Sequence, residues 1–89
     1  MKLYKIQVFG KVQGVYFRAS TRLKAIELLL KGYVENRKDG SVYIEAEGTE
    51  DQVKLFLEWC KNGPPGADVT KIHRSEGPLC YYTDFIIRR

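Results

Sequence analysis

The chain has few of the residues on which metal sites, redox centres and nucleophilic triads depend. Its 89 residues include two cysteines, Cys60 and Cys80, and one histidine, His73. The cysteines do not form a C-x-x-C pair, so a metal or redox site has little support. A single histidine likewise argues against a histidine metal cluster or a Ser–His–Asp triad. We expect a free, buried thiol at Cys60, with a Cys60–Cys80 disulfide as the alternative, and a surface or edge-strand position for His73.

Long apolar segments are also missing. No run approaches the roughly 20 apolar residues that span a bilayer, and the segment Met1–Lys5 lacks the apolar block of a signal peptide. We therefore expect a cytoplasmic protein with no membrane partner. With 89 residues, 44% of them hydrophobic and 29% charged, the chain is typical of one globular domain covering residues 1–89.

The net charge of +4 favours anionic partners in general. It does not distinguish a nucleic acid from a small phosphate compound. The basic residues are scattered along the chain, and the densest groups are Arg37-Lys38 and Arg88-Arg89. Because short groups of this kind are usually solvated, we expect most of these charges to have no specific partner.

Hydrophobic periodicity predicts five strands and two helices. Residues 3–9 alternate, with Ile6 and Val8 on one face, and Asp39-Gly40 is a tight-turn signal between two further alternating segments. The predicted strands are 3–9, 32–37, 42–47, 69–76 and 85–88. The order β-α-β-β-α-β with a short β tail predicts an α+β, ferredoxin-like fold. In this fold a mostly antiparallel sheet carries both helices on one face.

The first helix is expected from about residue 20 to about residue 30, with Ser20 and Thr21 as its N-cap candidates. Its residues on or beside the core face are Thr21, Ala25, Leu28, Leu23, Ile26 and Leu30. The second helix begins after Thr49, which forms a capping box with Gln52. Trp59 lies beside the apolar stripe of this helix, and we expect it to cover the rim of the core.

The segment Gly10–Arg18 is the strongest functional signal. An alternating strand runs into it, a helical pattern follows it, and Gly10 and Gly14 lie on either side of a turn. Backbone N–H groups at a helix start are unpaired and the helix dipole is positive there, so such a turn attracts anions. The guanidinium of Arg18 adds a group that binds phosphate well. These residues predict a pocket for a small phosphate.

Strand topology brings a second polar residue to this turn. Strands 3–9 and 32–37 are joined by a helix and should run parallel, so both end at the same edge of the sheet. With one strand between them, they lie roughly 10 Å apart. If Val34 packs under the helices, Asn36 faces the same side. We therefore expect Arg18 and Asn36 to face one small pocket.

These segments resemble the two signatures of the acylphosphatase family. Residues 8–18, V-F-G-K-V-Q-G-V-Y-F-R, are similar to the first signature, and residues 32–42, G-Y-V-E-N-R-K-D-G-S-V, are similar to the second. Further positions that resemble the family are Thr21, Ala25, Gly48, Gly63–Ala67 and Phe85–Arg88. The resemblance covers nearly the whole chain, and two spaced signatures in order are much more specific than a lone glycine loop.

The resemblance implies a small hydrolase that cleaves the carboxyl–phosphate bond of acylphosphates without a metal or other cofactor. It assigns phosphate binding to Arg18 and orientation of the attacking water to Asn36. The other phosphate ligands that it implies, through backbone amides, are Gln13, Gly14, Val15, Tyr16 and Phe17. A carboxylate is a good leaving group, so positioned donors can suffice without a strong base. We expect a monomer that binds a small-molecule acylphosphate and no nucleic acid.

Three positions depart from the family pattern. Leu29 stands where a glycine is common, so a positive φ there would strain Leu29 or rearrange the end of the helix. Tyr33 replaces a common tryptophan. Glu35 replaces a residue that is often basic or neutral, and by alternation it points away from Asn36.

Two other functions fit parts of the sequence. RNA-recognition domains share this element order and stack bases on aromatic side chains of the open sheet face. Here that face is expected to carry Lys5, Gln7, Tyr43, Glu45 and Glu47, a poor platform for RNA. The second alternative is a non-catalytic phosphate-binding domain of the same fold that serves a larger complex.

The motif residues also have purely structural interpretations. Arg18 would then cap a helix or pair with an acid such as Glu47, and Asn36 would be a turn residue. Gly10 and Gly14 would be simple turn glycines. The convergence of these residues at one sheet edge favours the functional interpretation.

Overall fold

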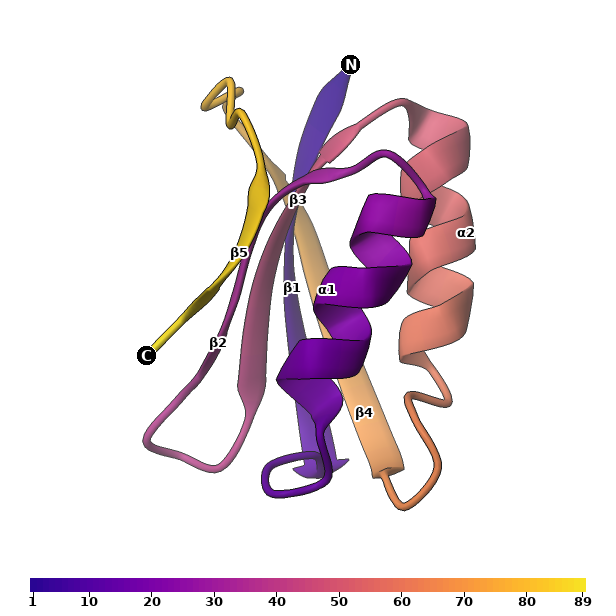
Figure 1. Cartoon of the computed structure of the whole chain (residues 1–89), viewed down its shortest axis with the longest axis vertical. Coiled ribbons are helices and arrows are strands. Elements are labelled where there is room, and N and C mark those ends of the chain that lie inside the picture. The colour runs from indigo at the N-terminus through magenta and orange to yellow at the C-terminus, as the bar shows by residue number, and fades with distance from the viewer.

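Two helices lie on one face of a five-stranded sheet (Figure 1) in a computed structural model that describes residues 1–89. The strands are β1 (Lys2–Lys11), β2 (Lys31–Asn36), β3 (Val42–Gly48), β4 (Asp68–Gly77) and β5 (Phe85–Arg88). The helices are α1 (Phe17–Glu27) and α2 (Glu50–Cys60). The α+β, ferredoxin-like arrangement predicted from the element order is confirmed.

The strand order β4-β1-β3-β2-β5 places β3 between β1 and β2. Both neighbours pair antiparallel with β3, so β1 and β2 run in the same direction, while β5 pairs parallel with β2. Val42 lies opposite Val8 in one ladder and opposite Asn36 in the other. The end of β2 is therefore level with Val8, three residues before the end of β1, about 10 Å away across β3.

The core lies between the sheet and the helices. Its strand residues include Ile6, Val8, Val34 and Ile44, all fully buried. α2 begins with the predicted capping box, because Thr49 accepts the N–H of Gln52 and the Gln52 side chain accepts the N–H of Thr49.

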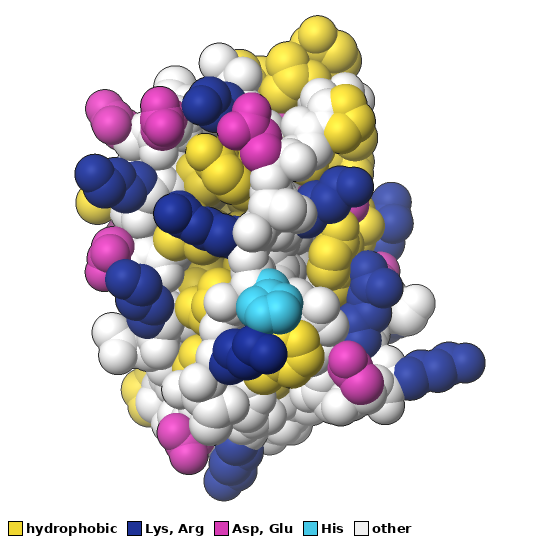
Figure 2. Space-filling model, turned by 180° about the vertical axis from the view of Figure 1, so that it is seen from behind, with side chains coloured by type: hydrophobic (Ala, Val, Ile, Leu, Met, Phe, Trp, Pro, Cys, Tyr) yellow, Lys and Arg dark blue, Asp and Glu magenta, His cyan; other side chains and the backbone are white.

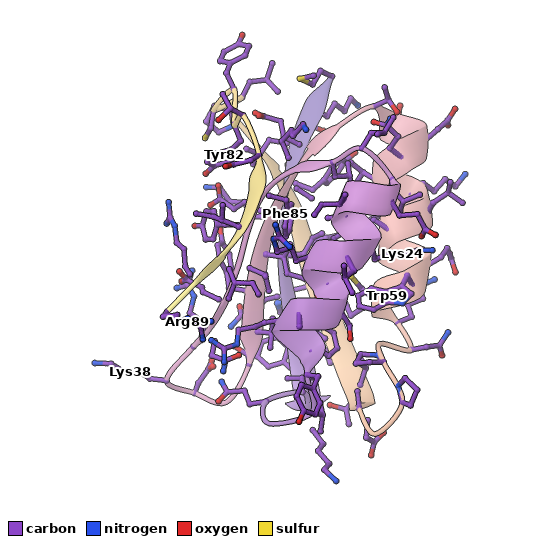
Figure 3. All side chains as sticks on the ribbon, viewed as in Figure 1. Lys24, Lys38, Trp59, Tyr82, Phe85 and Arg89 are labelled. Carbon is purple, nitrogen blue, oxygen red and sulfur yellow. The ribbon has the colours of Figure 1, made fainter.

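Trp59 covers the rim of this core, as predicted. Its ring centroid lies 5.8 Å from that of Phe17 and 6.2 Å from that of Phe56. Figure 3 shows Trp59 on α2 on the side of α1. The indole thus joins the two helices at the end of the molecule where α1 begins.

The start of α1 differs from the prediction. The helix begins at Phe17 directly after Tyr16, which has a φ of 59° and forms no side-chain cap, so Ser20 and Thr21 are not N-caps. Phe17, Thr21 and Ala25 are the buried residues of this helix and lie on one face, since residues four apart share a helix face. Leu23 and Ile26 are consequently 66% and 46% exposed, and their prediction as flanking core residues was wrong.

The end of α1 contains the strain predicted for Leu29. Its φ is 62°, the left-handed conformation that glycine adopts at low cost. The N–H of Leu29 donates to Ile26 O and the N–H of Leu30 donates to Ala25 O, the bond pattern of a Schellman motif. Leu29 therefore ends the helix in the usual geometry, at a strain on the order of 1 kcal/mol.

The two cysteines and the histidine have simple environments. Cys60 is buried and Cys80 is exposed, and both thiols are free, so the disulfide alternative was wrong. Burial raises the pKa of the Cys60 thiol, which is inert as a result. His73 is exposed on β4, an edge strand, as predicted.

Neither helix has the length and apolar character needed to cross a membrane.

The side of the sheet opposite the helices is less open than predicted. Figure 2 shows this side, on which basic and apolar side chains are interspersed. Glu47 faces it but is only 2% exposed, because the segment after β4 crosses over its carboxylate. The N–H groups of Cys80, Tyr81 and Tyr82 donate to this carboxylate at 2.6, 3.0 and 2.8 Å.

Glu45 is the centre of a tyrosine cluster on the same side. The hydroxyl groups of Tyr33, Tyr43 and Tyr82 donate to its carboxylate at 3.2, 2.7 and 2.7 Å. Burial raises the pKa of Glu45, but the three hydrogen bonds together outweigh it, and the net pKa is lowered. The carboxylate therefore contributes to stability while it is ionised, and it holds the chain before β5 against β2 and β3.

The substitution Glu45→Gln is expected to lower the free energy of unfolding at pH 7 by about 1–2 kcal/mol, because it replaces charge-assisted hydrogen bonds with neutral ones. A lowered native pKa gives stability that is present above the unfolded pKa, about 4.3, and is lost as the pH falls through the native value. Urea unfolding should therefore show a difference in the free energy of unfolding between the unchanged protein and the variant that is smaller at pH 3 than at pH 7. Glu58→Gln, at an exposed carboxylate paired with Lys61, is the control. An equal loss at both pH values would contradict a charge effect.

Candidate functional site

A cavity of about 310 Å³ lies at the sheet edge where β1 and β2 end. It lies between the start of α1 and the ends of β2 and β5. The residues that line it are Val12, Gly14, Tyr16, Phe17, Arg18, Ala19, Asn36, Ile87 and Arg89. Its side chains include two guanidinium groups and one amide but no carboxylate side chain, histidine or thiol, so the side chains of the lining favour an anion.

The loop between β1 and α1 is held in a tight, strained path. Gly10 has a φ of 121°, and a Cβ atom there would lie 2.1 Å from the carbonyl oxygen of Asp68. Gly14, at a φ of 74°, and Tyr16 turn the chain into the helix through left-handed conformations. Gly10 is thus required by the close approach of β4, and Gly14 by the turn itself.

The backbone N–H groups of residues 13–19 donate to no other part of the chain. The first intrahelical bond runs from the N–H of Ser20 to Tyr16 O at 3.0 Å. Unpaired N–H groups at a helix start, together with the positive end of the helix dipole, bind phosphate oxygens. This loop and the first turn of α1 have the donors that an anion cradle needs.

Gln13 connects this loop to the β2–β3 hairpin. Its side-chain amide donates to Arg37 O at 2.7 Å and to Ser41 O at 3.0 Å. Gln13 does not line the cavity, and neither does Val15, which packs against the core. Of the phosphate-binding residues expected from the sequence, Gly14, Tyr16, Phe17 and Arg18 line the cavity. Gln13 lies outside it and holds the loop against the hairpin.

Arg18 lies in the first turn of α1, and its side chain is half-buried at the cavity. It forms no ion pair with Glu47 or with any other acid of the protein. Its guanidinium donates no hydrogen bond within the chain. Because all of its donors are free, they are available to a bound anion.

Asn36 is the last residue of β2 and lines the same cavity as Arg18. The hairpin turn after it is closed by other groups: the N–H of Arg37 donates to Ser41 O at 2.8 Å, and the Asp39 carboxylate accepts the N–H and hydroxyl of Ser41. These hydrogen bonds from Ser41 hold the pKa of Asp39 below its usual value. The amide of Asn36 takes no part in the turn and is free to bind a ligand or a water.

The cavity contains residues that the sequence analysis missed. Ile87 lies on β5 and Arg89 directly follows that strand, and the parallel pairing of β5 with β2 brings both to the cavity that Asn36 lines. Apolar Val12 and Ala19 complete the wall. Arg89 was predicted to be an ordinary solvated charge; the alternation of Phe85, Ile87 and Arg89 was the available signal, but it needs the pairing partner of β5 to be known.

Comparison with known proteins agrees, over nearly the full chain, with the family resemblance seen in the sequence. The acylphosphatase family model matches residues 4–87. The chain is 49% identical to the acylphosphatase of Thermotoga maritima over 88 residues, which cover 99% of this chain and 98% of that protein. The acylphosphatase structure from Bacillus subtilis superimposes with a TM-score of 0.98 at 42% identity, covering 100% of both chains. Full-length HypF in its phosphate- and nucleotide-bound form is similar at a TM-score of 0.89 and 33% identity, over 99% of this chain and 12% of that one.

Proposed function

Because the chain belongs to the acylphosphatase family and hydrolyses acylphosphates to a carboxylate and inorganic phosphate, we propose that the Arg18–Asn36 cavity is where this reaction occurs. One observation carries the proposal: a loop and first helical turn whose N–H groups are unpaired, the free guanidinium of Arg18 and the free amide of Asn36 meet at a cavity that no acidic side chain lines.

The phosphoryl group of the substrate binds to the loop between β1 and α1. The backbone N–H groups of residues 13–18 and the guanidinium of Arg18 donate hydrogen bonds to its oxygens. Negative charge spreads over these oxygens in the transition state of phosphoryl transfer, so preorganised donors stabilise it more than they stabilise the ground state. The bracing of the loop by Gln13 supports this role, since it limits the reorganisation needed during the reaction.

Asn36 orients the attacking water. Its amide lies at the end of β2 and can accept from a water with its oxygen and donate with its nitrogen. The water oxygen forms a bond to phosphorus in line with the P–O bond to the acyl group, which breaks, and the electron pair leaves with the carboxylate. One water proton moves to a phosphoryl oxygen or to solvent. No side-chain base is needed, because the carboxylate is a good leaving group.

Hydrolysis of benzoyl phosphate in water enriched in oxygen-18 tests the direction of attack. Attack at phosphorus places the label in inorganic phosphate and none in benzoate, which mass spectrometry of the two products measures. Enzymatic incorporation of the label into benzoate, above that of the uncatalysed reaction, would contradict the proposal because it requires attack at the carbonyl carbon.

The second candidate is a domain that binds phosphate without hydrolysing a substrate. This candidate is supported by the similarity to HypF, because the matching segment is only 12% of that much longer chain and therefore serves there as one part of a larger protein. The end-to-end match to curated acylphosphatases supports the enzyme instead. Absence of benzoyl phosphate hydrolysis by the folded protein would favour the binding-only function.

Three further expectations concern the oligomeric state, the binding partners and the location of the protein. We propose a monomer as the active unit, as the sequence predicts. A small-molecule acylphosphate as substrate follows from the family, and the expectation that the protein binds no nucleic acid stays a prediction of the sequence. A cytoplasmic location stays a prediction of the sequence.

A further inference from the structure

The cavity contains a second guanidinium group, that of Arg89, which the mechanism above does not use. We propose that Arg89 is a second phosphate-binding residue, which holds the phosphoryl group from the side of Asn36, opposite the loop. The proposal rests on the proposed function of the cavity and names a further binding residue for the same reaction.

Strand pairing places Arg89 beside Asn36. β2 and β5 are parallel, and the last paired residues are Glu35 and Arg88. Asn36 is the last residue of β2 and Arg89 directly follows the last residue of β5, so both come immediately after this last pair. Both belong to the lining of the cavity. The position of Arg89 relative to the water-orienting residue thus follows from the register of the sheet.

Alternation along β5 turns Arg89 toward the cavity. Phe85 is buried in the core with its ring centroid 6.4 Å from that of Phe56, and Ile87 packs against the same core. Arg89, one residue after the end of β5, comes next in this alternation and lines the cavity. Arg88 points to the opposite side, where its guanidinium lies 3.8 Å from the centre of the Tyr33 ring.

β5 is held firmly enough to position this residue. The N–H of Gly32 donates to Asp84 O at 2.8 Å, and Nε of Arg22 on α1 donates to Phe85 O at 3.2 Å. The stacking of Arg88 on Tyr33 fixes the other end of the strand. The guanidinium of Arg89 itself forms no ion pair and no hydrogen bond in the chain, so its donors are free for a ligand. Figure 3 shows Arg89 at the end of β5.

Charge and stereochemistry both favour the phosphoryl group as the partner of Arg89. The phosphoryl group of an acylphosphate carries close to two negative charges at neutral pH, and Arg18 offsets only one of them. In-line attack places the leaving acyl group on the far side of phosphorus from the water. A residue next to Asn36 is therefore on the water side, within reach of the phosphoryl oxygens and away from the acyl group.

The substitution Arg89→Gln tests this role, with inorganic phosphate as the probe. We expect the inhibition constant of phosphate against benzoyl phosphate to rise about tenfold, the effect of one charge-assisted hydrogen bond at a partly exposed site. Arg89→Lys should give an intermediate value, because it keeps the charge but not the planar fork. Lys38→Gln is the matched control, since it removes the same charge at the tip of the β2–β3 hairpin, where Lys38 points away from the protein (Figure 3).

Three outcomes decide the proposal. A tenfold rise with Arg89→Gln and less than twofold with Lys38→Gln supports it. Equal, small effects of both substitutions overturn it, because they indicate a general charge effect. Unchanged phosphate inhibition together with selective loss of activity on 4-carboxybenzoyl phosphate also overturns it, since Arg89 would then bind the acyl group. Failure of the proposed function is distinguishable, because it is measured with variants of Arg18 and Asn36 that leave Arg89 in place.

Discussion

Replacement of Arg18 by alanine is expected to lower kcat/KM for benzoyl phosphate by about 10³-fold or more, the range measured for arginines that act on a transferring phosphoryl group. The free, half-buried guanidinium of Arg18 lines the same cavity as the loop with the unpaired N–H groups. Its loss removes both binding of the phosphoryl dianion and stabilisation of the transition state. Steady-state kinetics should show weakened inhibition by inorganic phosphate together with the loss of turnover.

Arg18→Lys separates charge from geometry in this experiment. Lysine supplies a point charge but no planar pair of donors, so we expect partial phosphate binding and low turnover. Because Arg18 makes no ion pair within the protein, neither variant should be much less stable, which thermal unfolding can check. Unchanged phosphate inhibition in a folded Arg18→Ala variant would show that the anion binds elsewhere.

Replacement of Asn36 by alanine is expected to lower kcat by about 10²–10³-fold, the usual effect of removing one positioning donor. Inhibition by inorganic phosphate should change little, because the loop and Arg18 still bind the anion. The amide forms none of the hydrogen bonds that close the hairpin, so the fold should be retained. Measurement of kcat and of the phosphate inhibition constant on the same protein separates turnover from binding.

Glu35→Gln is the control for Asn36. Glu35 precedes Asn36 on β2, points to the other side of the sheet and pairs with Arg37 at 2.9 Å. Its loss should alter the surface charge near the hairpin and leave kcat nearly unchanged. Full hydrolysis of benzoyl phosphate by Asn36→Ala would exclude the assigned role, and an equal loss in Glu35→Gln would show that the strand end, not the amide, matters.

Local patterns predicted most elements of the fold because they depend on neighbouring residues alone. The alternation of Ile6 and Val8 and the Thr49–Gln52 capping box are of this kind, and both appear as predicted. The start of α1 was not predictable in the same way. Ser20 and Thr21 are good N-cap residues by type, but Tyr16 adopts a left-handed conformation that starts the helix earlier. The close contact between Gly10 and Asp68 O, far along the chain, belongs to the same strained loop.

The residues of the cavity likewise fall into those that the sequence predicts and those that it does not. Arg18 and Asn36 could be identified from sequence, because each belongs to a motif with a local chemical meaning and because the element order implies parallel β1 and β2. Arg89 could not, since its place depends on which strand β5 joins. The burial of Glu45 also depends on distant partners, with Tyr82 lying 37 residues away.

The sequence by itself determined the periodicity of the strands and helices, the glycine-bracketed loop and the donors available at its end. These follow from backbone sterics and side-chain chemistry within a few residues. The tertiary structure alone decided that the loop is braced on the hairpin by Gln13, that the carboxylates of the open face are covered, and that a second arginine faces the cavity. Each of these requires contacts between segments far apart in the chain, whose pairing depends on the packing of the whole sheet.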